Sequence, residues 1–178
     1  MERRTATLVS RVVAHTGRIV RLEVDRVTLP TGHTLDMEIV RHPGSVVLLP
    51  LPAPGSIILI RQYRYAIDRW IWELPAGTLK PGEEPAAAAA RECEEEIGLV
   101  PGRVTLLGGY FPTPGFCDEE MVYCRCEDLR PPAPDSTIQK DEDEEIEPKT
   151  FTLAEARALV ASGEIVDLKT LAGLNLVS

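Results

Sequence analysis

The sequence has little positive charge for its length. It holds 19 Lys and Arg against 28 Asp and Glu, which gives a net charge of −9 over 178 residues. No basic stripe is present to displace counterions from a nucleic-acid backbone, which argues against that class of partner. Six of the acidic residues lie together between positions 141 and 147, so the rest of the chain is closer to neutral. A polyanionic substrate would therefore need local help from arginines or metal ions.

Histidine, cysteine and long apolar runs are also scarce. The three histidines are scattered, with no Ser or Cys elbow nearby to suggest a nucleophilic triad. The four cysteines follow no disulfide-rich or zinc pattern, so we expect free thiols in a reducing cytoplasm. No apolar run approaches the roughly 20 residues of a membrane span, and no signal-peptide core follows the first residues. We therefore predict a cytoplasmic protein with no nucleic-acid or membrane partner.

The first part of the chain favours a β layer. Residues 5–28 carry β-rich runs separated at Gly17, PTGHT at 30–34 reads as a turn, and the LDMEIVRH that follows alternates as a strand. The length fits one domain, which we place at 45–178. The β layer at 1–44 is predicted to be a small antiparallel extension of it.

The remainder of the chain mixes strands and helices. The apolar runs at 45–51 and 56–63 flank PAPG and predict a hairpin of buried strands. Further elements are expected as follows: strands at 104–111 and 120–129, a polar proline-rich loop after them, and helices at 85–97, between Thr152 as N-cap and Gly163, and within 167–177. Elements mixed in this way predict an α+β domain with an α/β/α layered architecture, a sheet between helices.

The most informative stretch covers residues 77–99 and reads GTLKPGEEPAAAAARECEEEIGL. Its helix is predicted to begin at Pro85 and to end before Gly98, because an alanine run follows the proline and no breaker intervenes.

Three glutamates stand on one face of this helix. Glu92, Glu95 and Glu96 are spaced i, i+3 and i+4, so their carboxylates lie side by side. Like charges at this spacing repel, and the helix dipole disfavours anions in the last turn. A hard cation such as Mg²⁺, which prefers oxygen ligands, would explain why the carboxylates are there.

The fixed residues of this stretch follow the spacing G-x5-E-x7-R-E-U-x-E-E-x-G-U, where U is a bulky apolar residue. They are Gly77, Glu83, Arg91, Glu92, Glu95, Glu96 and Gly98. The stretch therefore resembles the motif of the Nudix hydrolases, which cleave a nucleoside diphosphate linked to another moiety. One departure is Cys93 at the first U position, where the family usually has Leu or Val; cysteine behaves there as a small buried apolar residue. The resemblance implies the Nudix fold, a mixed sheet between helices.

The resemblance also implies a Mg²⁺ site, with Mn²⁺ as a substitute. Glu92, Glu95 and Glu96 match the metal-binding glutamates of the motif, and the backbone carbonyl of Ala76 matches a further ligand.

Three other motif residues would support that site. Arg91 matches the motif arginine, and its guanidinium can bridge carboxylates and hold them in place. Glu83 is expected to have a similar orienting role. Gly77 would let the loop turn sharply and approach the metal closely.

Two stretches outside the motif resemble the ADP-ribose pyrophosphatase branch of the family. IRQYRY leads into WELPAG and places Arg61 and Arg64 near the active-site loop, where arginine suits phosphate recognition. Pro114 follows the last motif residue by 15 positions, a marker of relatives that act on ADP-ribose. Thr113 and Glu119 fall where relatives have residues that contact the substrate.

The acidic run 141–147 resembles a loop that, in relatives, brings a glutamate into the active site. Glu142 and then Glu144 are the matching positions for the general base. Glu119 and Glu96 stay open as alternatives, because all four are ionised at neutral pH and the choice depends on distance to the attacking water.

The N-terminal layer is exchanged between subunits in ADP-ribose pyrophosphatases, which implies a homodimer with the adenine at its interface. Glu38 and Arg41 could contact the base across that interface. Aromatic side chains near the expected entrance could stack on it or serve as core or dimer packing: Tyr63, Tyr65, Trp70 and Trp72.

The resemblance thus implies Mg²⁺-dependent hydrolysis of ADP-ribose to AMP and ribose 5-phosphate. Two alternatives stay open. One is another nucleoside diphosphate sugar, such as GDP-mannose, or a dinucleoside polyphosphate. The other is a Nudix-fold sensor that binds ADP-ribose without cleaving it.

Overall fold

A computed structural model of the chain describes residues 5–138 and 145–177. Contacts between Cα atoms divide the chain into two compact units. The first runs up to Gly44 and also includes Phe111–Glu120, whereas the second comprises Ser45–Tyr110 and the chain from Met121 onward. The sequence analysis had counted residues 111–120 in the larger domain. Within the described residues, no helix has the length and apolar character needed to span a membrane.

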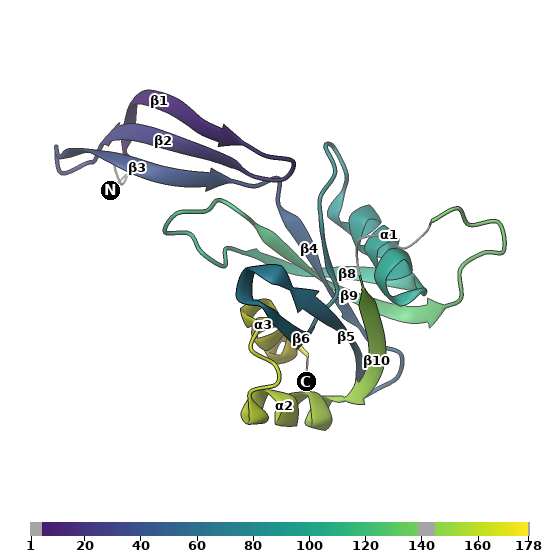
Figure 1. The fold of residues 1–178 in the computed structure, drawn as a ribbon. Helices are drawn as coiled ribbons and strands as arrows, with labels where there is room; N and C mark the ends of the chain where they lie inside the picture. Colours follow the sequence, from purple (N-terminus) through teal and green to yellow (C-terminus); the bar gives the residue numbers. More distant parts are fainter. Residues whose placement is uncertain (1–4, 139–144, 178) are drawn as a thin grey trace. The chain divides into compact units, whose positions relative to one another are not determined.

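The first unit is built on a three-stranded antiparallel sheet in the order β1-β2-β3 (Figure 1). Its strands are β1 (Thr7–Thr16), β2 (Arg21–Thr28) and β3 (Thr34–Arg41). The segment Phe111–Glu120 joins this unit through backbone hydrogen bonds, from Val40 N to Phe116 O at 2.7 Å and from Asp118 N to Val40 O at 3.2 Å. The predicted antiparallel layer is therefore present.

The second unit contains two sheets. Its strands are β4 (Ser45–Pro50), β5 (Ser56–Arg64), β6 (Arg69–Glu73), β7 (Ala76–Thr78), β8 (Val100–Tyr110), β9 (Met121–Arg130) and β10 (Ile146–Thr152). One sheet has the order β7-β4-β9-β8 and is mixed, because β4 is parallel to β9 while the other pairs are antiparallel. The other has the antiparallel order β10-β5-β6.

Among the described residues, three α-helices accompany these sheets, α1 (Pro85–Ile97), α2 (Leu153–Ser162) and α3 (Leu168–Leu176), together with a 3-10 turn at Tyr65–Ile67. Helix α1 has the predicted bounds and ends at Gly98, whose φ of 69° is a left-handed conformation that glycine adopts without strain. Helix α2 begins at a capping box in which Thr152 and Glu155 satisfy each other's backbone N–H groups.

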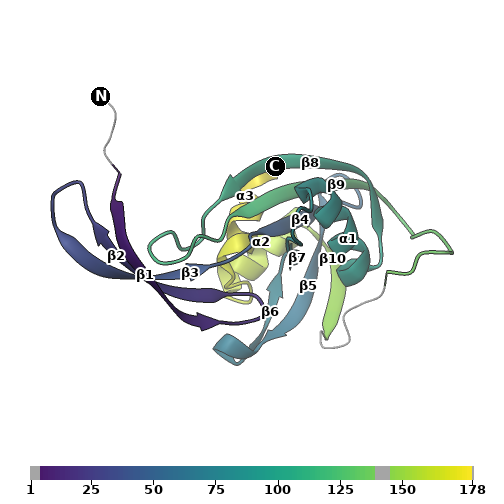
Figure 2. The ribbon, with the colours of Figure 1, turned by 90° about the horizontal axis from the view of Figure 1, so that it is seen from above.

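Helix α1 covers one side of the sheets, and α2 and α3 cover the other (Figure 2). Side chains along the buried strand β4 alternate between the two apolar clusters: Val46 and Leu48 pack with α1, whereas Val47 and Leu49 pack with α2 and α3. This arrangement confirms the predicted α+β sandwich, a sheet layer between helices.

The predicted topology contained one wrong hairpin and lacked one strand. Strands β4 and β5 are buried as predicted but do not form a hairpin, since β4 pairs with β7 and β9 whereas β5 pairs with β10 and β6. Both edges of β4 are occupied by strands later in the chain, and β5 lies in the other sheet between β10 and the next strand, β6. Strand β10 was not predicted; its Pro148 cannot donate to a ladder, and β10 is tolerated as a strand because it lies at a sheet edge.

Candidate active site

Helix α1 presents its carboxylates around a single guanidinium. Nη1 of Arg91 lies 2.6 Å from Oε1 of Glu92 and 2.6 Å from Oε2 of Glu95. All three side chains are largely buried. The sequence predicted that Arg91 bridges carboxylates, and the structure contains this bridge; the part of Arg91 in catalysis stays a prediction.

Glu83, in the loop before α1, fixes the other edge of the same guanidinium. Its carboxylate accepts from Nε of Arg91 at 2.8 Å and from Nη2 at 2.9 Å, a bidentate pair. The backbone N–H of Lys80 donates to it at 3.0 Å. The hydrogen bonds from Arg91, followed by the one from Lys80, lower the pKa of Glu83 to about 2. Glu83 therefore stays ionised and holds Arg91 at neutral pH.

Gly77 lies directly against the carboxylate of Glu92. A Cβ atom built at this position would be 1.8 Å from Cδ of Glu92, so any side chain would displace the carboxylate. Burial raises the pKa of Glu92 to about 7, with Arg91 opposing the shift and Glu95 adding to it. The close approach that Gly77 permits is therefore to a glutamate side chain of α1.

The third glutamate of the helix face contacts the loop that contains Ala76. Oε2 of Glu96 accepts a hydrogen bond from the backbone N–H of Ala76 at 3.1 Å. Glu96 is 5% exposed. The loop end and the carboxylate face of α1 are thus in direct contact, as a shared site requires.

The donor chemistry of this cluster suits a hard divalent cation. Glu92, Glu95 and Glu96 supply oxygen ligands, and two of these carboxylates already converge on one positive charge, the Arg91 guanidinium. In the arrangement described for residues 5–138 and 145–177, however, no group of three His, Cys, Asp or Glu side chains is placed to hold a metal ion. The residue types fit a cation, and the guanidinium of Arg91 occupies the position between two of the carboxylates.

Arg64 lies at the end of β5 and pairs with a buried carboxylate. Its Nε and Nη2 donate to the two oxygens of Glu73 at 2.8 and 3.0 Å. Burial lowers the pKa of Arg64, but the hydrogen bonds and charge of Glu73 outweigh it, and the charges of Glu96 and Asp167 raise the pKa further. Of the α1 carboxylates, Glu96 therefore acts on the charge of the Arg64 guanidinium.

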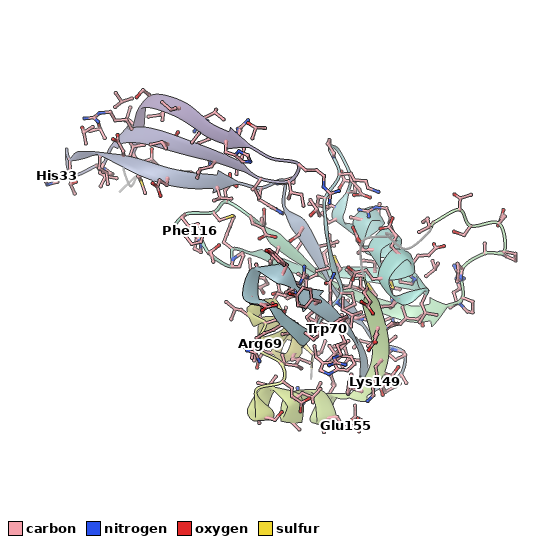
Figure 3. All side chains as sticks on the ribbon, viewed as in Figure 1. His33, Arg69, Trp70, Phe116, Lys149 and Glu155 are labelled. Atoms are coloured by element: carbon pink, nitrogen blue, oxygen red, sulfur yellow. The ribbon has the colours of Figure 1, made fainter. Side chains whose placement is uncertain are left out.

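Arg61 belongs to the opposite face of the same strand. It pairs across the sheet with Trp72, and its guanidinium lies over the ring of Trp70 at 5.6 Å from the centroid. Arg69 and Trp70 of β6 are labelled in Figure 3. These side chains, with Gly163 and Glu164, line an open hollow of about 430 Å³. Since side chains of a strand alternate, Arg61 and Arg64 point away from each other and cannot grip one phosphate together.

The predicted aromatic residues differ in their surroundings. The ring of Tyr63 is 5.9 Å from that of Trp70, and its hydroxyl donates to Asp68. Tyr65 is 85% exposed. Trp72, which lines the hollow, also makes an edge contact with Phe151; this contact is core packing, one of the two roles left open for these aromatics.

Five predicted site residues belong to the first unit: Glu38, Arg41, Thr113, Pro114 and Glu119. Arg41 is engaged in ion pairs there, through Nε to Glu23 at 2.7 Å and through Nη1 to Asp118 at 3.0 Å. The carbonyl of Thr113 accepts from the backbone of residues 116 and 117 and closes a turn around Pro114. Glu119 lies 3.8 Å from Nδ1 of His42, and Glu38 is exposed.

Glu142 and Glu144, the predicted general bases, lie outside the described residues. Their assignment stays a prediction.

Sequence reasoning missed a polar network behind Arg64. Glu73 is 1% exposed and pairs with Lys169 of α3 in addition to Arg64. The hydroxyl of Thr170 accepts from the backbone N–H of Leu74 at 2.7 Å. Glu73 is part of the WELPAG segment, so its place before the loop was visible, but nothing in the sequence linked it to a lysine 96 positions away.

Comparisons with known proteins bear on this site. A family model for the NUDIX domain matches residues 40–172. The ADP-ribose pyrophosphatase of Bacillus subtilis (strain 168) is 40% identical over 154 residues, which cover 86% of this chain and 82% of that protein. The ADP-ribose pyrophosphatase of Mycobacterium tuberculosis (strain ATCC 25618 / H37Rv) is 35% identical over 167 residues, covering 93% and 80%.

A solved structure agrees with the fold. The crystal structure of an ADP compounds hydrolase matches with a TM-score of 0.84, covering 99% of this chain and 94% of that one at 21% identity. The match to the NUDIX domain covers the motif helix, the loop before it and both sheets of the second unit. The chain therefore belongs to the Nudix family of hydrolases, as its motif predicted.

Proposed function

We propose that this Nudix hydrolase cleaves the pyrophosphate of ADP-ribose, with water, to AMP and ribose 5-phosphate. The observation that carries the proposal is the α1 cluster, in which Glu92 and Glu95 converge on Arg91 and Glu96 contacts the loop at Ala76. The two relatives named ADP-ribose pyrophosphatase support the choice of substrate.

We propose Mg²⁺ as the cofactor, with Mn²⁺ as a substitute, held by Glu92, Glu95, Glu96 and the carbonyl of Ala76. When bound, the ion would neutralise phosphate oxygens and lower the pKa of the attacking water. The chain supplies the acidic face of α1 for it. Arg91, itself anchored by Glu83, keeps these carboxylates from drifting apart by mutual repulsion.

Arg64 is the cation best placed to bind the pyrophosphate. Its bond to Glu73 uses Nε and Nη2, which leaves further N–H groups of the guanidinium for phosphate oxygens. Arg61 is on the other face of β5, so we assign it to the hollow beside Trp70, where it could contact another part of the substrate.

A carboxylate must accept the proton of the attacking water while the bond between phosphorus and the bridging oxygen breaks. Glu142 is the first candidate and Glu144 the second, with Glu119 and Glu96 as alternatives. Substituting each in turn by glutamine and measuring kcat would identify the base as the one whose loss lowers kcat while Mg²⁺ affinity is retained.

Turnover on a substrate panel tests the proposed function. ADP-ribose, GDP-mannose, UDP-glucose, NADH, diadenosine polyphosphates and nucleoside triphosphates would be compared with and without Mg²⁺. The proposal expects Mg²⁺-dependent cleavage, fastest with ADP-ribose. Preference for another compound would replace the substrate and keep the chemistry. Tight binding of ADP-ribose without cleavage would instead identify a sensor. The presence of every motif carboxylate argues against a sensor.

We also propose a homodimer in which the N-terminal segment is exchanged between subunits, in the cytoplasm. Every residue of β1 is exposed, including Leu8, Val9, Val12 and Val13, so the strand shows apolar side chains on both faces. An apolar strand of this kind calls for a partner surface. The four cysteines are free, which suits a reducing compartment.

A further inference from the structure

A buried ionic network lies behind the predicted phosphate-binding arginine. Glu73 ends β6, is 1% exposed, and receives two cations: Arg64 from β5 and Lys169 from the first turn of α3. Lys169 is itself buried and donates to Asp167 at 3.0 Å. Two carboxylates and two cations thus form one connected group across three elements.

The network also fixes the chain that leads to the motif loop. Asp167 accepts from the backbone N–H of Thr170 at 3.0 Å and from its hydroxyl at 2.6 Å, and that hydroxyl accepts from Leu74 N. The carbonyl of Lys169 accepts from the hydroxyl of Tyr123 at 3.0 Å. The start of α3 is therefore anchored to both sheets, and Lys169 has little freedom to leave Glu73.

The arrangement gives Arg64 an unusual position for a surface cation. Its side chain is 42% exposed, while the carboxylate that anchors it is almost fully buried. The bidentate bond orients the guanidinium, and the unused N–H groups lie on the edge away from Glu73. A single carboxylate would also cancel most of the guanidinium charge. Lys169 limits this effect: with Lys169 the charges of the two cations and the two carboxylates balance, and without it the group around Arg64 would be net negative.

We infer that Glu73 and Lys169 are positioning residues that act through Arg64: Glu73 aims the free edge of the guanidinium at the substrate pyrophosphate, and Lys169 keeps the group around Arg64 from becoming net negative. Neither residue touches the substrate. The inference deepens the proposed function and rests on it for the identity of the ligand. It makes Lys169, a residue of α3 outside the motif, necessary for full phosphate affinity.

A double-mutant cycle on KM tests the inference. Lys169→Met removes the charge and keeps the length of the side chain; we expect KM to rise about tenfold with kcat changed by less than about twofold, since ground-state binding is weakened. Lys169→Arg should restore KM. In an Arg64→Ala background the Lys169→Met change should raise KM by less than about twofold, because the residue through which Lys169 acts is no longer present. An equal rise of KM in both backgrounds would mean a merely structural lysine and overturn the inference.

The control is Lys149→Met, the same substitution at an exposed lysine of β10 that lies over the ring of Phe151 (Figure 3). It should leave KM unchanged. Glu73→Gln provides a second variant of similar shape, so the test survives if Lys169→Met does not fold. Thermal unfolding of each variant separates loss of fold from loss of binding.

A measurement without substrate keeps this inference separate from the proposed function. The Nε–H resonance of Arg64 in a ¹⁵N NMR spectrum should be protected from exchange in the native protein, lost in Glu73→Gln and shifted in Lys169→Met. An Arg64 resonance that is identical in the native protein and both variants would refute the network. If the native protein cleaves no member of the panel, the proposed function fails, and this resonance still decides whether Glu73 and Lys169 position the Arg64 guanidinium.

Discussion

The two units of the chain are stabilised inside by different chemistry. In the second unit, strands β4 and β5 bury only aliphatic side chains over most of their length, and Leu48, Leu49 and Leu59 are fully buried. In the first unit, by contrast, two of the three buried side chains of β2 are acidic, Glu23 and Asp25, and the third is Val27.

The acidic pair of β2 is compensated by arginines from all three strands of its sheet. Glu23 binds Arg21 and Arg41, each at 2.7 Å, and Asp25 forms a bidentate pair with Arg11. Ion pairs give less net stability than apolar burial, since desolvation offsets most of the attraction. The second unit therefore has a mainly apolar core, whereas the sheet of the first unit depends more on ion pairs.

The motif cluster sits on the well-packed unit, and its loss should have the largest effect. We expect Glu95→Gln or Glu96→Gln to lower kcat by at least about a hundredfold with the fold intact, since metal-assisted hydrolysis would lose a ligand. Steady-state kinetics across a Mg²⁺ titration would measure this. A variant with near-native kcat would refute the metal assignment.

Truncations in the two units test the comparison directly. Leu48→Ala should cost about 2–5 kcal/mol of unfolding free energy, because it leaves a cavity in a fully buried layer. Val12→Ala in the exposed strand β1 should change the monomer by no more than about 0.5 kcal/mol. Denaturant titration at low protein concentration gives both values. Equal costs would show that β1 is already buried in an assembly.

Gly77 tests how tightly the loop and helix α1 meet. Gly77→Ala places a methyl group on the Glu92 carboxylate and should lower kcat about tenfold or more by displacing it, with about 1–3 kcal/mol of lost stability from overpacking. Gly82→Ala serves as a nearby control, because no atom lies within 4 Å of a Cβ there, although its φ of 75° adds some backbone strain. If Gly77→Ala kept native kcat, the contact would be unimportant for catalysis.

Acid should weaken the first unit before the second, with the smallest effect of the four. Hydrogen bonds from Arg41 and Arg11 lower the pKa values of Glu23 and Asp25 below their ordinary values of 4.5 and 3.8. Because the folded pKa values are the lower ones, the stabilisation is complete above the unfolded pKa values and is lost as pH falls through the folded ones. The protection of β2 amides from exchange, relative to their intrinsic rates at each pH, should therefore fall below about pH 4.5 while β4 stays protected. Parallel loss in both strands would contradict a β2 interior that depends on ion pairs more than the interior around β4 does.

Short-range rules predicted much of the second unit. The bounds of α1 follow from Pro85 and Gly98, and the start of α2 follows from Thr152, because helix ends are decided by the residues at the ends themselves. The supposed hairpin of β4 and β5 was wrong because nearness along the chain does not decide which strand fills which edge. Strand β10 was not predicted because a proline such as Pro148 is as typical of an irregular segment as of an edge strand.

In the site, too, short-range features followed from the sequence and long-range contacts did not. The sequence by itself determined the family, the helix and the shared face of Glu92, Glu95 and Glu96, because a spacing of three or four residues on a helix fixes neighbours without further information. The tertiary structure alone decided that Glu92 lies against Gly77 and that Lys169 meets Glu73 across 96 positions. Contacts of this length depend on which strands pair and which helix covers them, and burial then selects the partners, since a buried charge such as Glu73 is stable only beside its counterions.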